Sequence, residues 1–167
     1  MVARVPQGIV RSPDGGATFV PVGAALGTIN ACAIEFAPSS SDVAYVVDCG
    51  PPARVLRSTD AGQTWNAVAD LPALAGGYSG VPTVLAVDAI DADRVWIGDQ
   101  YGLRQSIDGG TTFERLARST GSSGVGRPIF FDATDPLRQR MGGRGVLRTQ
   151  DGGATWEDLT DPSHGWI

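Results

Sequence analysis

Aspartates recur along the chain in a pattern that could carry chemistry. Asp14, Asp60, Asp108 and Asp151 lie 46, 48 and 43 residues apart, each within the pattern Ser/Thr-x-Asp-x-Gly-x-Thr-Trp/Phe. Carboxylates can act as acids or bind calcium, but a calcium site takes about six to eight oxygen ligands. Each copy offers a single carboxylate. We therefore expect these aspartates to shape turns, and we expect no cofactor and no metal ion.

The other residue types of the pattern also suit a tight turn. The aspartate can accept hydrogen bonds from nearby backbone N–H groups, the serine or threonine can add a second local bond, and the glycine permits a positive φ. The aromatic residue is expected to start the next strand and to pack beneath the turn. The sixteen positions are Ser12, Asp14, Gly16 and Phe19; Ser58, Asp60, Gly62 and Trp65; Ser106, Asp108, Gly110 and Phe113; and Thr149, Asp151, Gly153 and Trp156.

A second pair of carboxylates, Asp48 and Asp99, occupies similar positions in successive units, at the end of an apolar strand-like run. Glycoside hydrolysis needs two carboxylates that face each other across the bond to be cleaved. Asp48 and Asp99 are therefore the candidate catalytic residues. The alternative is that they form turns, as aspartates at strand ends often do.

Polar and aromatic residues gather in the loops that join the expected strands and units. Tyrosines there could stack on sugar rings, and the remaining side chains could donate or accept hydrogen bonds. The alternative is that they are solvated loop residues. The candidates for a ligand-binding face are Tyr78, Gln100, Tyr101, Arg127 and Arg144.

The chain has two cysteines, Cys32 and Cys49, in adjacent strand-like runs separated by the turn sequence PSSSD. A hairpin centred on that turn places the two cysteines opposite each other, which would permit a disulfide bond. Two buried free thiols are the alternative. A disulfide would favour a location outside the cytoplasm.

The segments that carry these residues are predicted to be strands. Short runs rich in small and β-branched residues alternate with turns, and the 23 glycines and 11 prolines suit many tight turns. No segment keeps a helical period over ten or more residues. A repeat of this length with β composition predicts an all-β propeller of four-stranded antiparallel blades. The blades of this single segment, 1–167, are expected at about 1–25, which lacks its first strand, 26–72, 80–118 and 126–162.

The repeated pattern resembles the Asp-box, or BNR repeat, of sialidases, family 74 glycoside hydrolases, sortilin-type receptors and photosystem II assembly factors. The segment FFDATDPLRQRMGGRGVLRTQDGGATW looks most like a blade of the family 74 hydrolases and their non-catalytic relatives. The resemblance implies that the Asp-box is a structural turn between the third and fourth strands of a blade. It also implies a location outside the cytoplasm.

Charge and hydropathy narrow the function classes. The formal net charge of −5 argues against nucleic acid as a partner, and no apolar run approaches the roughly 20 residues that span a bilayer. The start of the chain shows no signal peptide. The favoured hypothesis is a non-catalytic binding or scaffold propeller that recognises a carbohydrate or a protein. The alternatives are part of a family 74-like hydrolase and an assembly factor. Because four blades with one incomplete do not close neatly, a larger parent chain or a homodimer is expected to complete the ring.

Overall fold

The computed structural model describes residues 1–6, 8–71, 84–99, 102–115, 129–132, 135, 137–142 and 146–159. Within this part of the chain the elements are fifteen β-strands and one short 3-10 helix. Their bounds, in chain order, are β1 (Val2–Val5), β2 (Gly8–Arg11), β3 (Val20–Val22), η1 (Ala24–Leu26), β4 (Ala31–Phe36), β5 (Ala44–Asp48), β6 (Arg54–Ser58), β7 (Asn66–Asp70), β8 (Val84–Val87), β9 (Val95–Asp99), β10 (Gly102–Ser106), β11 (Glu114–Arg115), β12 (Ile129–Phe131), β13 (Gln139–Gly142), β14 (Val146–Thr149) and β15 (Glu157–Asp158).

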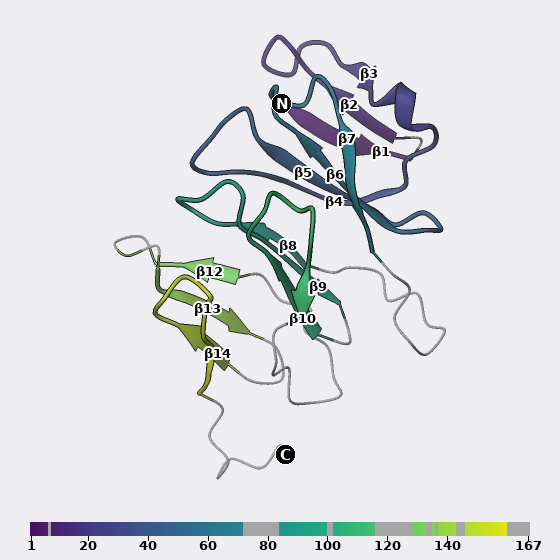
Figure 1. Cartoon of the computed structure of the whole chain (residues 1–167). Helices are drawn as coiled ribbons and strands as arrows, with labels where there is room; N and C mark the ends of the chain where they lie inside the picture. The colour runs from purple at the N-terminus through teal and green to yellow at the C-terminus, as the bar shows by residue number, and fades with distance from the viewer. Residues whose placement is uncertain are drawn as a thin grey trace, which may run out of the picture.

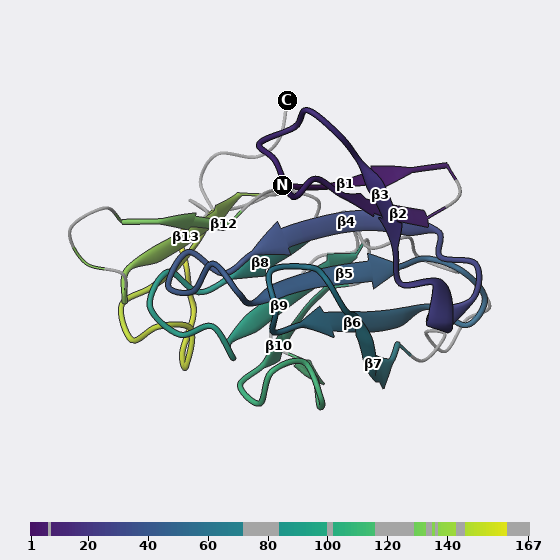
Figure 2. The same cartoon turned by 90° about the horizontal axis from the view of Figure 1, so that it is seen from above.

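The strands form four antiparallel sheets in which chain neighbours are also neighbours in space. We call them the first sheet (β1–β3), the second (β4–β7), the third (β8–β11) and the fourth (β12–β15). They follow one another from one end of the molecule to the other (Figure 1), and in the view from above the second sheet lies in front of the third (Figure 2). The all-β prediction is confirmed, and the first sheet has three strands where the others have four.

The core lies between consecutive sheets. All five residues of β5 are buried, because neighbouring side chains along a strand point to opposite faces of the sheet and both faces are covered. Tyr45 and Val47 pack in one apolar cluster with residues of the third sheet, whereas Val46 packs in another with Ile9 of the first sheet. We call the face of a sheet that points toward the sheet after it in the chain its forward face, and the opposite one its backward face.

One detail of the repeated turn differs from expectation. The aromatic residue was expected to start the fourth strand, but β7 begins at Asn66, one residue after Trp65, and β15 begins at Glu157, one residue after Trp156. The reason is local. Trp65 still belongs to the turn, because its indole N–H donates to the Gly62 carbonyl at 3.1 Å. The Trp65 ring therefore packs against its turn, whereas Phe19, its equivalent in the first sheet, is 45% exposed.

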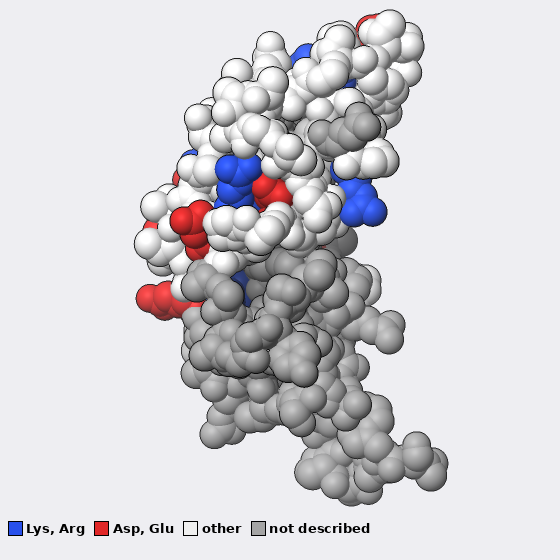
Figure 3. Space-filling model, turned by 90° about the vertical axis from the view of Figure 1, so that its right-hand side faces the viewer, with Lys and Arg blue, Asp and Glu red and all other residues white. Residues whose placement is uncertain are grey.

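Among the described residues there is no helix with the length and apolar character needed to cross a membrane. On the face shown in Figure 3, the described basic and acidic side chains lie close to each other within a mostly uncharged surface. The described part of this face therefore presents no extended basic area of the kind that binds nucleic acid.

Candidate functional site

The repeated turn is held by a small set of internal hydrogen bonds. In the second sheet, the Ser58 hydroxyl donates to Asp60 Oδ1 at 2.8 Å and accepts the Gly62 backbone N–H at 2.9 Å. Thr64 donates twice to the same carboxylate, from its backbone N–H at 2.8 Å and from its hydroxyl at 2.6 Å. Matching bonds occur in the other three copies. In each copy the carboxylate therefore accepts its hydrogen bonds from residues of its own turn.

These bonds favour the ionised carboxylate. The hydroxyl of the following threonine is the largest influence at Asp14, Asp60 and Asp108, and it lowers the pKa of each to about 2. At Asp151, burial is the largest influence and raises the pKa, but the hydrogen bonds led by those from Thr155 outweigh it and the pKa again falls to about 2. A carboxyl group with so low a pKa is unsuited to donate a proton near neutral pH.

The four low pKa values predict acid unfolding. A carboxylate whose pKa is lower in the folded than in the unfolded chain stabilises the fold above the unfolded value, 3.8. That contribution is lost as the pH falls through the folded value of about 2. We expect tryptophan fluorescence to report a steep loss of structure between about pH 4 and pH 2.

The matched variants for this titration are Asp60→Asn and Asp42→Asn. Asparagine at position 60 cannot ionise, so this variant should be less stable at pH 7 and lose less of its stability on acidification. Asp42 is exposed, and its carboxylate forms no hydrogen bond with any described residue. Equal acid sensitivity of the wild type and Asp60→Asn would contradict the assignment.

Asp48, a candidate catalytic carboxylate, lies at the end of β5 and is almost fully buried, with 2% of its surface exposed. It accepts the backbone N–H groups of Asn30 at 2.8 Å and Gly50 at 3.0 Å. It also accepts the guanidinium Nε of Arg54, the residue opposite it in the ladder, at 2.9 Å. The carboxylate is therefore surrounded by protein donors, which indicates a structural role.

Asp99, the second candidate, ends β9 as Asp48 ends β5. The backbone thus places the two aspartates at equivalent positions of successive sheets, as the repeat predicted. The residue opposite Asp99 in its ladder is Gly102, which has no side chain that could pair with it as Arg54 pairs with Asp48. The side chain of Asp99 lies outside the described part of the structure.

The other predicted ligand-facing residues also lie outside the described residues. They are Tyr78, Gln100, Tyr101, Arg127 and Arg144. Their part in a ligand-binding face therefore stays a prediction. In the described part of the chain, no group of three or more histidine, cysteine, aspartate or glutamate side chains is placed to hold a metal ion.

The structure forms a disulfide bond between Cys32 and Cys49, with a Cα–Cα distance of 5.9 Å. The hairpin register differs from the one that the turn sequence predicted. Ala31 faces Asp48 and Ala33 faces Val47, so Cys32 is the extra residue of a bulge. The bulge brings Cys32 toward Cys49, which follows the last residue of β5. The disulfide therefore lies beside Asp48 and closes the same end of the hairpin.

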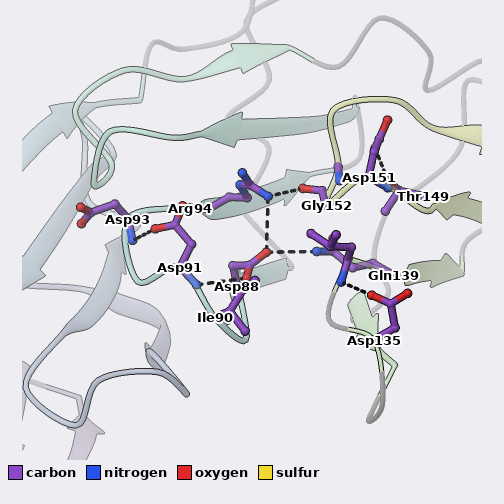
Figure 4. Close-up of polar contacts among 12 residues, drawn as sticks. Asp88, Ile90, Asp91, Asp93, Arg94, Asp135, Gln139, Thr149, Asp151 and Gly152 are labelled. Carbon is purple, nitrogen blue, oxygen red and sulfur yellow. Dashed lines mark hydrogen bonds and ion pairs between the residues drawn. The ribbon is translucent and has the colours of Figure 1, made fainter.

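Sequence reasoning missed a buried carboxylate that joins the third and fourth sheets. Asp88 is 1% exposed and accepts the side-chain amide of Gln139, in β13, at 3.1 Å. Arg94 lies 3.8 Å from Asp88 and donates to the Gly152 carbonyl, in the repeated turn of the fourth sheet, at 2.7 Å. Figure 4 shows these contacts converging between the two sheets. The recurrence of Asp-Ala-x-Asp at 88–91 and 132–135 was the signal that could have found Asp88.

No protein-family model and no curated protein matches the chain. Among solved structures, the chain is similar to the GH74 xyloglucanase from Xanthomonas campestris, with 25% sequence identity, a TM-score of 0.66 and coverage of 96% of this chain and 29% of that one. The GH74 enzyme of Niastella koreensis gives 19% identity, a TM-score of 0.67 and coverage of 93% and 27%. The structure of YCF48 bound to D1 peptide gives 18% sequence identity, a TM-score of 0.54, and coverage of 78% of this chain and 40% of that one.

The chain has the fold of a stretch of a β-propeller. The four sheets are its blades, and the similarity to GH74 and YCF48 propellers covers most of the chain. The chain spans less than a third of the length of the GH74 enzymes that it matches. In this propeller fold, Asp48 and Asp99 lie at the same end of neighbouring blades, whereas Asp88 and Gln139 join one blade to the next.

Proposed function

We propose that the chain is a non-catalytic Asp-box propeller segment that binds a ligand, with a carbohydrate as the first candidate. The observation that carries this proposal is the state of Asp48. A general acid or base must reach the substrate, and the Asp48 carboxylate is buried and already accepts three protein donors. Asp48 is therefore not available to act as one of the two catalytic carboxylates.

Two observations support a carbohydrate ligand. The GH74 xyloglucanase from Xanthomonas campestris, at 25% identity, matches 96% of this chain with a TM-score of 0.66, whereas the two YCF48 structures, at 18% and 19% identity, each match 78% of it with TM-scores of 0.54 and 0.52. The proposed ligand-binding face also includes Tyr78 and Tyr101, whose rings could stack on sugar rings. We propose a location outside the cytoplasm, which the disulfide between Cys32 and Cys49 supports.

The second candidate function is part of a GH74-like glucan hydrolase. The observation that favours it is Asp99, which has no arginine opposite it and occupies the position in the third blade that Asp48 occupies in the second. A protein ligand is the third candidate, because the YCF48 structure similar to this chain was determined with a D1 peptide. That similarity, at 18% identity, shows the fold alone, so assembly-factor activity ranks below the other two.

In the decisive experiment, the chain is incubated with xyloglucan and new reducing ends are measured. Binding is measured in parallel as retardation of the protein in native gels that contain xyloglucan. We expect retardation without any reducing ends. Tyr101→Ala should weaken binding about tenfold, the scale of one lost aromatic stacking contact, and Tyr101→Phe should retain it. Reducing ends that disappear in Asp99→Asn would establish the hydrolase instead. Absence of retardation on every glucan tested would overturn the carbohydrate proposal.

A further inference from the structure

In the second, third and fourth blades, two turns lie at the same end, which we call the turn end. One is the repeated turn, and the other joins the first and second strands. In the third blade the Gly109 backbone N–H donates to the Asp93 carbonyl at 2.9 Å, so the two turns are joined directly. The second and fourth blades have the equivalent bond. β9 runs from the turn end to Asp99, so this end lies opposite the one that carries the candidate catalytic residue.

Two exposed isoleucines lie at the turn end of the third blade. Ile90, in the turn between β8 and β9 (Figure 4), is 58% exposed, and Ile107, in the repeated turn, is 71% exposed. Both have polar equivalents in the second blade. The backbone hydrogen bonds of the turns align Ile90 with Ser39. The repeated pattern aligns Ile107 with Thr59. The turns therefore fold without an aliphatic side chain at either position.

A third aliphatic residue, Leu137 of the fourth blade, is 44% exposed. The backbone hydrogen bonds that join the two turns of each blade align it with Asp42 and Asp93. A side-chain carbon built on Gly152 would have both Leu137 and Arg94 of the third blade within 4 Å, so Leu137 lies beside the third blade. Adjacent turns thus carry aliphatic side chains at positions where the second blade has polar ones.

The turn end also carries unbalanced negative charge. Asp93 pairs with Arg57, and Asp135 pairs with Arg138. Other aspartates at this end of the second, third and fourth blades pair with none of the described arginines: Asp42, Asp60, Asp91, Asp108 and Asp151. Three of them belong to repeated turns, whose hydrogen bonds favour the ionised carboxylate. The exposed isoleucines therefore lie among permanent negative charges.

Charge and exposure together define what could bind at this end. The negative charge repels the phosphate groups of nucleic acids and of anionic membranes. A second copy of the chain, paired through the same end, would bring carboxylates against carboxylates. Protein interfaces combine an apolar centre with a polar rim, and here the aliphatic side chains and the aspartates supply the two parts. The complementary partner therefore presents aliphatic side chains with lysine or arginine beside them.

We propose that the turn end of the third blade is a docking surface for a basic amphipathic segment of a partner protein. Ile90, Ile107 and Leu137 contact the aliphatic side chains of that segment. Asp91 and Asp108 attract its lysine or arginine side chains. This function goes beyond the proposed carbohydrate binding and does not depend on it, because the turn end and the candidate carbohydrate-binding loops lie at opposite ends of the strands.

Fluorescence anisotropy tests the proposal with the full chain. The probe is a labelled peptide of about 14 residues, with leucine at helical spacing and lysine at the other positions. We expect saturable binding to the wild type that weakens as the salt concentration rises, because the contact includes exposed charges. The double variant Ile90→Ser/Ile107→Thr should bind the peptide about tenfold more weakly, since it removes two apolar contacts.

The double variant introduces the residues that the second blade has at these two positions. Its turns should therefore fold as in the wild type, and urea denaturation should show the same stability. It leaves every charge unchanged, so binding by electrostatic attraction alone would not be affected. Val20→Thr is the matched control, because Val20 is also an exposed aliphatic residue, at 47%, but lies in β3 of the first blade. This variant should bind the peptide as the wild type does.

Equal affinity of the wild type and the double variant would overturn the proposal, since only charge would then attract the peptide. Absence of binding, or equal binding of a peptide with glutamate in place of lysine, would overturn it as well. Wild-type dimers that the double variant abolishes, measured by light scattering, would assign the surface to a second copy instead. If the double variant does not fold, hydrogen exchange of the wild type decides. The peptide should protect 88–94 and 106–113, and unchanged exchange there would contradict the docking surface.

Discussion

Replacing Asp48 with alanine is expected to lower the free energy of unfolding by about 3 kcal/mol, the scale for removing one partner of a buried ion pair. The substitution leaves Arg54 without its carboxylate and removes the acceptor of two backbone N–H groups, those of Asn30 and Gly50. The cost arises mainly because these partly accessible donors lose an acceptor that is itself only 2% exposed. Urea denaturation followed by tryptophan fluorescence measures the change.

Two further variants distinguish a structural role of Asp48 from a catalytic one. Asp48→Asn retains the shape and one acceptor oxygen, so it should recover part of the lost stability. Asp42→Ala removes an exposed carboxylate at the other end of the same hairpin and should change the free energy of unfolding by less than about 0.5 kcal/mol. If Asp48→Ala were as stable as the wild type and yet abolished cleavage of a glucan, the residue would be catalytic and the structural assignment would be wrong.

The parts of the fold that the sequence predicted correctly depend on short-range contacts. The repeated turn is complete within eight residues, from Ser58 to Trp65, and its hydrogen bonds join residues two to four positions apart. Its residue types therefore report its structure directly. The strand order also followed from sequence, because each strand pairs with its chain neighbour and the connecting turns are rich in glycine and proline.

The roles of buried polar residues could not be predicted, because they depend on partners that are distant in sequence and on burial. Asp48 and a solvated strand-end aspartate look alike in the sequence, and only the fold shows that Asp48 accepts the Asn30 N–H 18 residues away. Asp88 contacts Gln139 across 51 residues. The bulge at Cys32 likewise shifts the hairpin register by an amount that the turn sequence does not encode.

Asp88 is the residue whose loss should separate two blades. Asp88→Ala removes the buried acceptor of the Gln139 amide and the carboxylate that lies beside Arg94, which in turn holds the Gly152 carbonyl. We expect a loss of about 3 kcal/mol in the free energy of unfolding, since the carboxylate that is removed is 1% exposed and accepts hydrogen bonds from Ile90, Asp91 and Gln139. Hydrogen exchange should rise in β13 and β14 before it rises in β5 and β6, because the fourth blade loses its polar contact with the third.

The matched control is Asp91→Ala, in the same turn. The Asp91 carboxylate accepts only the Asp93 N–H among the described residues, at 3.0 Å, so its loss should affect the turn and leave the contact between the blades intact. Asp88→Asn should be intermediate, because an amide oxygen can still accept from Gln139 but carries no charge to attract Arg94. If Asp88→Ala and Asp91→Ala had the same effect on stability and on exchange in β13, the polar contact between blades would contribute nothing. The apolar cluster of Ala86, Trp96, Leu103 and Ile129 would then account for the cohesion of the two blades.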